Sequence, residues 1–182
     1  MEHAATKDTA KSNKLLSIGF EWISAAIASL VLVSVLFSCV FRTVNVDGDS
    51  MTNTLSDGDT LLLSTMPYEP SYGDVVVIRR ENDTPLIKRV IGLPKDVIRI
   101  DNNGRVFRNG LELVEPYIKE NFTPQNGMTL TITVENNTLF VMGDNRGGSL
   151  DSRMLGCLPQ ENVVGKVFYR LAPLPGPITN GE

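Results

Sequence analysis

The sequence predicts a mostly β fold, an antiparallel barrel-like or folded-over sheet with a small inserted β segment, preceded by one N-terminal transmembrane helix. Three observations predict it. Trp22–Phe41 is a run of 20 residues without a charge. After it, short β-like segments alternate with turns rich in Gly, Asn and Asp. No second long segment with a 3.6-residue period follows.

The apolar run comes first in the chain. At a rise of about 1.5 Å per residue it covers about 30 Å, the thickness of a bilayer hydrocarbon core. Lys7, Lys11 and Lys14 precede it, whereas Arg42 is the only basic residue in the 20 positions that follow. The positive-inside rule therefore predicts a cytoplasmic N-terminus and an extracytoplasmic C-terminal part of a single-pass protein in the cell membrane.

Two other interpretations of the run compete with a lipid-embedded anchor. A cleaved signal peptide is disfavoured because the run exceeds an apolar core of about 7–15 residues and no Ala-x-Ala site ends it. Leu36–Cys39 only loosely resembles a lipoprotein cleavage box. We expect a cytoplasmic tail over 1–21, with 1–14 disordered, a transmembrane helix over 22–41 and one domain over 42–182.

Strands and turns alternate through the C-terminal domain. The alternation predicts strands at Thr43–Asp47, Thr60–Ser64, Asp74–Arg80, Leu86–Gly92, Val97–Asp101, Arg105–Arg108, Leu130–Val134, Thr138–Met142 and Val163–Arg170. Gly58, Gly104 and Asn109-Gly110 are suited to tight turns that need positive φ. Residues 97–137, with a polar loop at Asn121–Gly127, suggest an inserted β cap. The proline-rich segment Ala172–Pro177 is expected to be irregular.

Composition excludes several classes of function. The net charge is −4 and no basic block occurs, so nucleic-acid binding has no electrostatic basis. Cys39 lies in the apolar run and Cys157 far from it, which disfavours a disulfide. Two cysteines and the single histidine, His3, cannot build a zinc site. The sequence requires no metal or cofactor, and nothing in it specifies an oligomeric state.

Lys88 is the first candidate for chemistry. In a strand it shares a face with Leu86 and Val90. Burial there favours the neutral amine and would lower the pKa from about 10.4 towards about 7–8, which makes lysine a competent base for a hydroxyl. The alternative is that the ammonium reaches solvent from a sheet edge.

Ser50, in Gly48-Asp49-Ser50-Met51 close after the apolar run, is the candidate nucleophile. A histidine base is excluded because His3 is near the start of the polar tail. Gly48 allows close backbone approach, and the Ser50 N–H would face a developing oxyanion. The alternative is a serine that only hydrogen-bonds its own loop.

The loop Gly143–Arg153 follows a predicted core strand and is dense in charge. Asp144, Arg146, Asp151 and Arg153 suit a buried network of arginine–carboxylate pairs, and Ser149 could orient the Lys88 amine by a hydrogen bond. The alternative is a polar loop held together by salt bridges without a function.

Together these segments resemble the type I signal peptidases, which are membrane-bound Ser-Lys endopeptidases. The resemblance covers most of the chain, in the form of the compact Gram-positive enzymes. It includes the N-terminal anchor and rests on Ser50–Leu55, Gly58-Asp59, Gly73–Val76, Lys88–Pro94 and Gly143–Arg153.

The resemblance implies a role for each matching residue. Ser50 is the nucleophile, Lys88 the general base and Ser149 the residue that orients it. Asp151 and Arg153 are a supporting pair, Asp144 and Arg146 organise the same loop, and Met51 and Arg89 flank the catalytic residues. The substrates implied are exported preproteins with small residues, typically alanine, at positions −1 and −3. They would bind as an added strand over shallow apolar pockets, next to the lipid bilayer.

Two positions depart from the family pattern, and a third varies among its members. Asn53 stands where proline is usual, which leaves the turn less restricted in the unfolded chain. Lys95 stands where glycine is usual, so this position should avoid the conformations that only glycine favours. Gly48 stands where some members carry a serine hydroxyl for the oxyanion hole, so a second donor must be a backbone amide or be missing.

The function expected is therefore a membrane-anchored serine endopeptidase that removes signal peptides with a Ser-Lys dyad. Two alternatives remain. One is a specialised Ser-Lys peptidase with few clients, such as a pilin-processing or conjugation-associated enzyme. The other is an inactive, membrane-tethered β-domain that binds partners.

Overall fold

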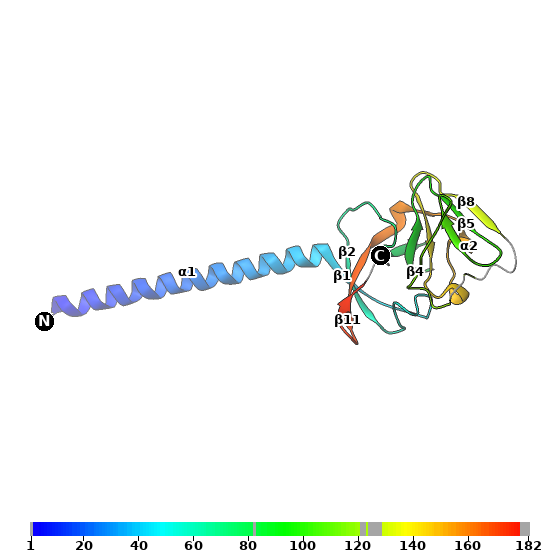
Figure 1. The fold of residues 1–182 in the computed structure, drawn as a ribbon. Coiled ribbons are helices and arrows are strands. Elements are labelled where there is room, and N and C mark those ends of the chain that lie inside the picture. The colour runs from blue at the N-terminus through cyan, green and yellow to red at the C-terminus, as the bar shows by residue number, and fades with distance from the viewer. Residues whose placement is uncertain (1, 82, 121–122, 124–128, 179–182) are drawn as a thin grey trace. The chain divides into compact units, whose positions relative to one another are not determined.

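The structure, a computed structural model, describes residues 2–81, 83–120, 123 and 129–178. Its contacts divide the chain into two compact units, Met1–Val40 and Phe41–Glu182. Figure 1 shows that the first contains one helix and the second contains the strands.

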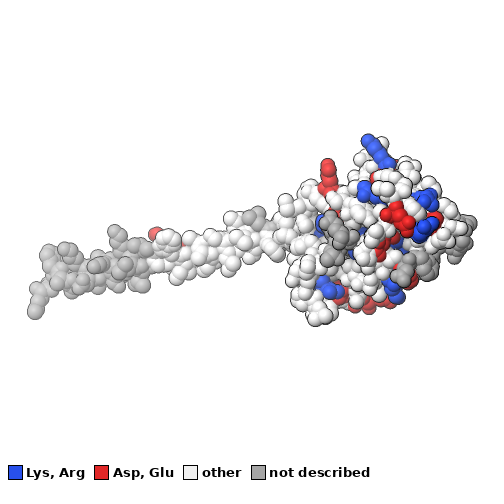
Figure 2. All heavy atoms as spheres, in the orientation of Figure 1, with Lys and Arg blue, Asp and Glu red and all other residues white. Residues whose placement is uncertain are grey.

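The first unit is the helix α1, Glu2–Val40. Its segment Gly19–Val40 has 22 residues and a mean hydropathy of 2.5, long and apolar enough to cross a membrane. In Figure 2 the described part of α1 is almost free of charge, whereas groups of both signs lie on the visible face of the second unit. We expected residues 1–14 to be disordered, but α1 already begins at Glu2. Neither glycine nor proline interrupts the chain before Gly19, which explains the longer helix.

The larger sheet of the second unit is antiparallel throughout. Its strands are β1 (Phe41–Asn45), β2 (Thr60–Ser64), β3 (Val75–Arg80), β4 (Asp83–Gly92), β9 (Thr138–Met142), β10 (Leu158–Pro159), β11 (Val163–Ala172) and β12 (Gly176–Pro177). The order is β1-β2-β11-β3-β4-β9-β10, and β12 pairs with β11. The ends of this order do not pair with each other, so the described strands form a folded-over sheet and not a closed barrel.

A smaller sheet lies within residues 97–137. It has the order β7-β6-β5-β8, formed by β5 (Val97–Ile100), β6 (Val106–Arg108), β7 (Leu111–Glu112) and β8 (Leu130–Thr133). Ile98 and Ile100 pack in one buried cluster with Ile91, Phe140 and Met142 of the larger sheet. The two sheets therefore share a core. Most of the loop predicted at Asn121–Gly127 lies outside the described residues.

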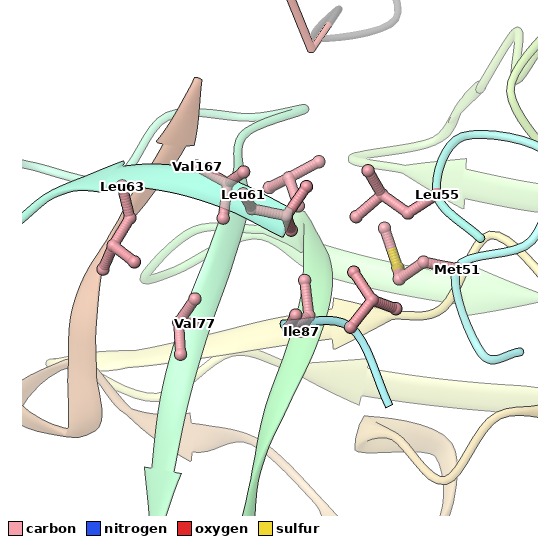
Figure 3. Packing of buried hydrophobic residues seen from close by; sticks show 9 residues of the cluster. Met51, Leu55, Leu61, Leu63, Val77, Ile87 and Val167 are labelled. Atoms are coloured by element: carbon pink, nitrogen blue, oxygen red, sulfur yellow. The ribbon is translucent and has the colours of Figure 1, made fainter. Parts of the chain in front are cut away.

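Two features of the core position the site. β4 lies between β3 and β9, so it is an interior strand. On one side of it, Ile87 packs in a cluster with Met51 and Leu55, which belong to the turn after β1, as Figure 3 shows. The turn that carries Ser50 is thus fixed to β4 by buried apolar side chains.

The predicted fold class is confirmed, and every predicted strand is present with small differences at its ends. The sequence prediction missed elements of a few residues each: β7, β10, β12, the 3₁₀ helices η1 (Arg146–Gly148) and η2 (Gln160–Asn162), and the helix α2 (Ser152–Leu155). β12 lies in the segment that we expected to be irregular, and Phe41 belongs to β1 and not to the helix. Such short elements form through tertiary pairing and have no periodicity of their own.

Turn conformations agree with the prediction at several positions and contradict it at one. Gly58, Gly104, Asn109 and Gly110 all have positive φ, as expected. Lys95 also has a positive φ of 74°, although we expected it to avoid such conformations. It is the third residue of a turn that the Asp96 N–H closes on Leu93 O at 3.0 Å, a position that favours glycine.

Replacing Lys95 by glycine is expected to stabilise the protein. A left-handed non-glycine residue costs about 1–2 kcal/mol, and glycine adds about 0.4–1 kcal/mol of unfolded-state entropy. The balance predicts that Lys95→Gly raises the free energy of unfolding by about 0.5–1 kcal/mol, measured by chemical denaturation in detergent. Lys95→Ala, which keeps the strain, is the control. Equal stability of the glycine and alanine variants would contradict the explanation.

Candidate active site

Ser50 is positioned by the turn that joins β1 to β2. Gly48 has a φ of 87°, a conformation that favours glycine, and its amide donates a hydrogen bond to Asp57 Oδ1 at 2.8 Å. The space around the position of a Gly48 side chain is open, so the expected close backbone approach does not occur there. After Ser50, Met51 and Leu55 are each 1% exposed and pack into the core. The Ser50 hydroxyl is thus held on a turn that the buried side chains of Met51 and Leu55 fix to the core.

Lys88 lies on the interior strand β4 and is 2% exposed. Its Nζ lies 2.7 Å from Ser50 Oγ and 2.9 Å from Ile87 O. Burial lowers the pKa of Lys88 to about 8, although the charges of Asp151 and Asp144 partly oppose this shift. The alternative of a lysine that reaches solvent from a sheet edge is therefore wrong.

The contact between Lys88 Nζ and Ser50 Oγ can serve in either direction. A protonated ammonium donates to the hydroxyl oxygen, whereas a neutral amine accepts the hydroxyl proton. With a pKa of about 8, both forms of Lys88 occur near neutral pH. The pair therefore has the geometry and the basicity that proton transfer from a serine hydroxyl requires.

The loop Gly143–Arg153 holds the backbone of Ser50. The Asn145 N–H donates to Ser50 O at 3.1 Å, and Asn145 Nδ2 donates to Asp49 O at 3.0 Å. A side chain at Gly143 would collide with Ser50 O and with Ser149, which explains glycine at that position. The Ser50 N–H forms no hydrogen bond within the described residues.

Three arginines around the site each pair with a carboxylate. Arg89 donates to Asp144 from Nε at 2.9 Å and from Nη2 at 2.7 Å, and both side chains are fully buried. Arg153 donates to Asp151 at 2.9 and 2.8 Å. Arg146 does not pair with an aspartate of its own loop but with Glu115, at 2.6 and 2.9 Å.

Ser149 lies beside this network without a hydrogen bond. It is 6% exposed, and its Oγ has no partner among the described residues, so no bond to Lys88 is formed. Burial alone would raise the pKa of Asp151, but bonds and charge from Arg153, the Gly143 amide and the nearby Ser149 hydroxyl hold that pKa below its usual value. The Ser149 hydroxyl is thus close to Asp151, although the two form no hydrogen bond of ordinary geometry.

A cavity of about 260 Å³ opens at Ser50 and Lys88. Apolar side chains of β1, of the Ser50 turn and of β4 line much of it, among them Val44, Val46, Met51, Leu86 and Ile87. A larger hollow of about 480 Å³ is lined by the loop 65–70 with Leu93 and Pro94 and contains neither Ser50 nor Lys88. Of these two cavities, the smaller one is therefore next to Ser50 and Lys88.

Sequence reasoning missed several residues that build the site. Thr54 Oγ1 donates to Asp144 Oδ2 at 2.5 Å, and the ring of Tyr117 lies 4.0 Å from the Arg89 guanidinium carbon. Glu115 and Tyr117 lie in the segment that we expected to be an inserted β cap. One signal was present: if Arg89, Arg146 and Arg153 all join one buried network, the two aspartates of the loop Gly143–Arg153 are one carboxylate too few to pair with them.

Comparison with known proteins shows the family of this chain. The family model "Signal peptidase, peptidase S26" matches residues 19–172. A probable signal peptidase I-1 of Synechocystis is 36% identical over 84% of this chain and 82% of that protein. A signal peptidase I of Bacillus licheniformis is 35% identical over 92% of this chain and 94% of that protein.

A crystal structure of a signal peptidase I from Enterococcus faecalis is also similar. It is 29% identical, covers 54% of this chain and 97% of that one, and has a TM-score of 0.47. The family match spans the turn of Ser50, the strand of Lys88 and the loop that holds them. The chain belongs to the signal peptidase family of S26 peptidases.

Proposed function

We propose that this protein is a membrane-anchored serine endopeptidase that removes N-terminal signal peptides from exported preproteins, with Ser50 as nucleophile and Lys88 as general base. The observation that carries the proposal is the 2.7 Å contact between a buried lysine amine and the serine hydroxyl. Membership of the signal peptidase family supports the substrate class.

The proposed reaction begins with neutral Lys88. Its Nζ takes the proton of Ser50 Oγ as that oxygen attacks the scissile carbonyl carbon and forms a tetrahedral intermediate. Lys88 then gives the proton to the leaving amine, and the peptide bond breaks to leave an ester on Ser50. Water, deprotonated by Lys88, attacks the ester carbonyl, and the proton returns to Ser50 Oγ as the signal peptide leaves.

The Ser50 amide is the proposed oxyanion donor. It is free of partners within the described residues, as a donor reserved for a transient charge would be. The Gly48 amide already donates to Asp57, so it is a poor candidate for the second donor.

Supporting roles follow from the contacts around the dyad. Ser149, buried and without a partner among the described residues, is proposed to turn its hydroxyl toward the Lys88 amine when substrate is bound. Asp151 with Arg153, and Asp144 with Arg89, fix the loop against β4. Arg146 holds Gly143 O at 3.0 Å, and Met51 anchors the nucleophile turn in the core. These residues position the reactive groups and do not touch the scissile bond.

The cavity supports a preference for small side chains next to the cleaved bond. A volume of about 260 Å³, shared by more than one substrate residue and lined by branched apolar side chains, leaves little room for large groups. We therefore propose alanine-sized residues at positions −1 and −3 of the substrate, bound as an extended strand.

The helix α1 is proposed to anchor the domain at the extracytoplasmic surface of the membrane. Lysines precede Gly19–Val40, and a single basic residue follows closely, which favours a cytoplasmic N-terminus. Anchoring keeps Ser50 near the surface where exported chains emerge, which raises its effective concentration toward membrane-bound preproteins.

Removal of either reactive group is expected to abolish cleavage. We expect Ser50→Ala and Lys88→Ala to lower kcat/KM for a preprotein with an Ala-x-Ala site by at least about 1000-fold, because the nucleophile or its base is lost. The purified full chain in detergent is assayed by gel shift of the precursor. Ser56→Ala and Lys95→Ala, at exposed positions, serve as matched controls. Cleavage by both dyad variants at the parental rate would disprove the assignment.

The pH dependence should report Lys88. Because burial lowers its pKa to about 8, the neutral fraction, and with it kcat/KM, should rise with pH and level off above about 8. Below that value the rate should fall about tenfold per pH unit, as only the neutral amine is a base. A rate that is constant down to about pH 5 would be inconsistent with a lysine base.

Topology can be tested with epitope tags at both ends of the full chain. In intact spheroplasts, added proteinase K should remove a C-terminal tag and leave an N-terminal tag protected inside. Protection of the C-terminal tag would contradict the orientation. Separation of the N-terminal tag from the mature domain without added protease would instead indicate a cleaved signal sequence.

A further inference from the structure

Residues 115–119, which link β7 to the rest of the smaller sheet, lie against the network behind the dyad. The Lys119 N–H donates to Asp144 O at 3.0 Å, and the Tyr117 ring stacks on Arg89. Asn53 Nδ2, from the turn after Ser50, donates to the carbonyls of Tyr117 and Ile118 at 3.2 Å each. This segment, which we call the strap, thus contacts three elements: the turn that carries Ser50, the strand β4 and the loop Gly143–Arg153. We call that loop the catalytic loop.

We propose that Glu115 of the strap is a positioning residue that acts through Arg146 on the turn that holds Ser50, an inference that rests on the proposed peptidase function. Glu115 does not touch the dyad. Its effect would be to keep the nucleophile in the geometry that Lys88 needs.

The contact between Glu115 and Arg146 is bidentate and buried. Arg146 is 0% exposed and Glu115 is 6% exposed at their side chains. Glu115 Oε1 also accepts a bond from the Tyr117 hydroxyl at 3.0 Å. Because an arginine this deeply buried needs a counter-charge, Glu115 is the group that allows Arg146 to stay in this position.

Arg146 passes this restraint to the backbone of the catalytic loop. Its Nε donates to Gly143 O at 3.0 Å and its Nη1 donates to Thr123 Oγ1 at 2.7 Å. Two residues after Gly143, the Asn145 N–H donates to Ser50 O. The connection from Glu115 to the peptide of the nucleophile therefore runs through one side chain and one short stretch of backbone.

Asn53 ties the turn after Ser50 to the strap. Its φ is 94°, a conformation that proline cannot adopt. Its side chain binds the strap by two hydrogen bonds. The turn that carries Ser50 is thus held at two points. The strap binds it at Asn53, and the Asn145 N–H binds it at Ser50 O.

The test compares Glu115→Gln with Glu112→Gln in the full-length protein in detergent. Glu115→Gln replaces one carboxylate oxygen by an NH₂ group that cannot accept a guanidinium N–H, and it removes the charge. Glu112 is half exposed and contacts Arg105 only at 3.7 Å, so it serves as the matched control. Tyr117→Phe is a milder second variant, because it removes the hydroxyl that bonds to Glu115 Oε1 and keeps the ring over Arg89. Thermal unfolding identifies any variant that fails to fold.

Two readouts are measured on each variant. For Glu115→Gln we expect kcat on an Ala-x-Ala preprotein to fall about tenfold while KM changes less than about twofold. We also expect amide hydrogen exchange to speed up over residues 143–150, which a loss of stability spread over the whole domain would not confine to that loop. Tyr117→Phe should show the same pattern with a loss of about two- to threefold in kcat, and Glu112→Gln should match the parent in both readouts.

The outcomes separate this inference from the proposed function. Unchanged exchange over residues 143–150, or unchanged kcat in folded Glu115→Gln, would overturn the role of Glu115 even if the parent cleaves preproteins. If the parent protein does not cleave preproteins, the proposed peptidase function is wrong. Faster exchange in Glu115→Gln would then show only that Glu115 stabilises the loop, and its role in positioning the nucleophile would be overturned as well.

Discussion

The burial of one amine on an interior strand is the constraint on which the site depends. Lys88 lies on a strand without a free edge, because β3 and β9 flank β4, and only 2% of it is exposed to solvent. An ammonium in such a place is costly, so the pKa falls to about 8 and the neutral amine becomes available near physiological pH. The same burial brings Nζ to 2.7 Å from Ser50 Oγ. The lowered pKa of Lys88 and its contact with Ser50 thus both follow from its buried place on β4.

The charges around Lys88 do not cancel the effect of burial on its pKa. Asp144 and Asp151 lie close enough to favour the ammonium, and both oppose the lowered pKa of Lys88. Each is instead bound by its own arginine, Arg89 or Arg153, at hydrogen-bond distance. Because these pairs are close to neutral, the carboxylates compensate the amine only in part. The network therefore fixes the position of the loop Gly143–Arg153 and leaves Lys88 with a lowered pKa.

Local patterns predicted the fold class and marked Ser50 and Lys88 as candidates, and the resemblance to signal peptidases supplied their expected roles. Neither source could predict the contacts between residues that are far apart in the sequence. Turn signals and alternation located the strands, and Lys88 was identified by its apolar neighbours on one strand face. Glu115 and Tyr117 could not be found in this way, because their partners, Arg146 and Arg89, are 31 and 28 positions away and no periodicity links them. The positive φ of Lys95 was missed because a lysine carries no local signal for it, although the turn demands that conformation.

The most direct test of the central claim is the pKa of Lys88 itself. A titration of the full chain in detergent, followed by NMR of lysine labelled at Cε and assigned with Lys88→Arg, measures it without any assay of activity. We predict one lysine that titrates near 8, as burial on β4 requires. A Lys88 signal that titrates at the ordinary value of 10.5 would contradict the account, because the amine would then be charged and could not accept the Ser50 proton.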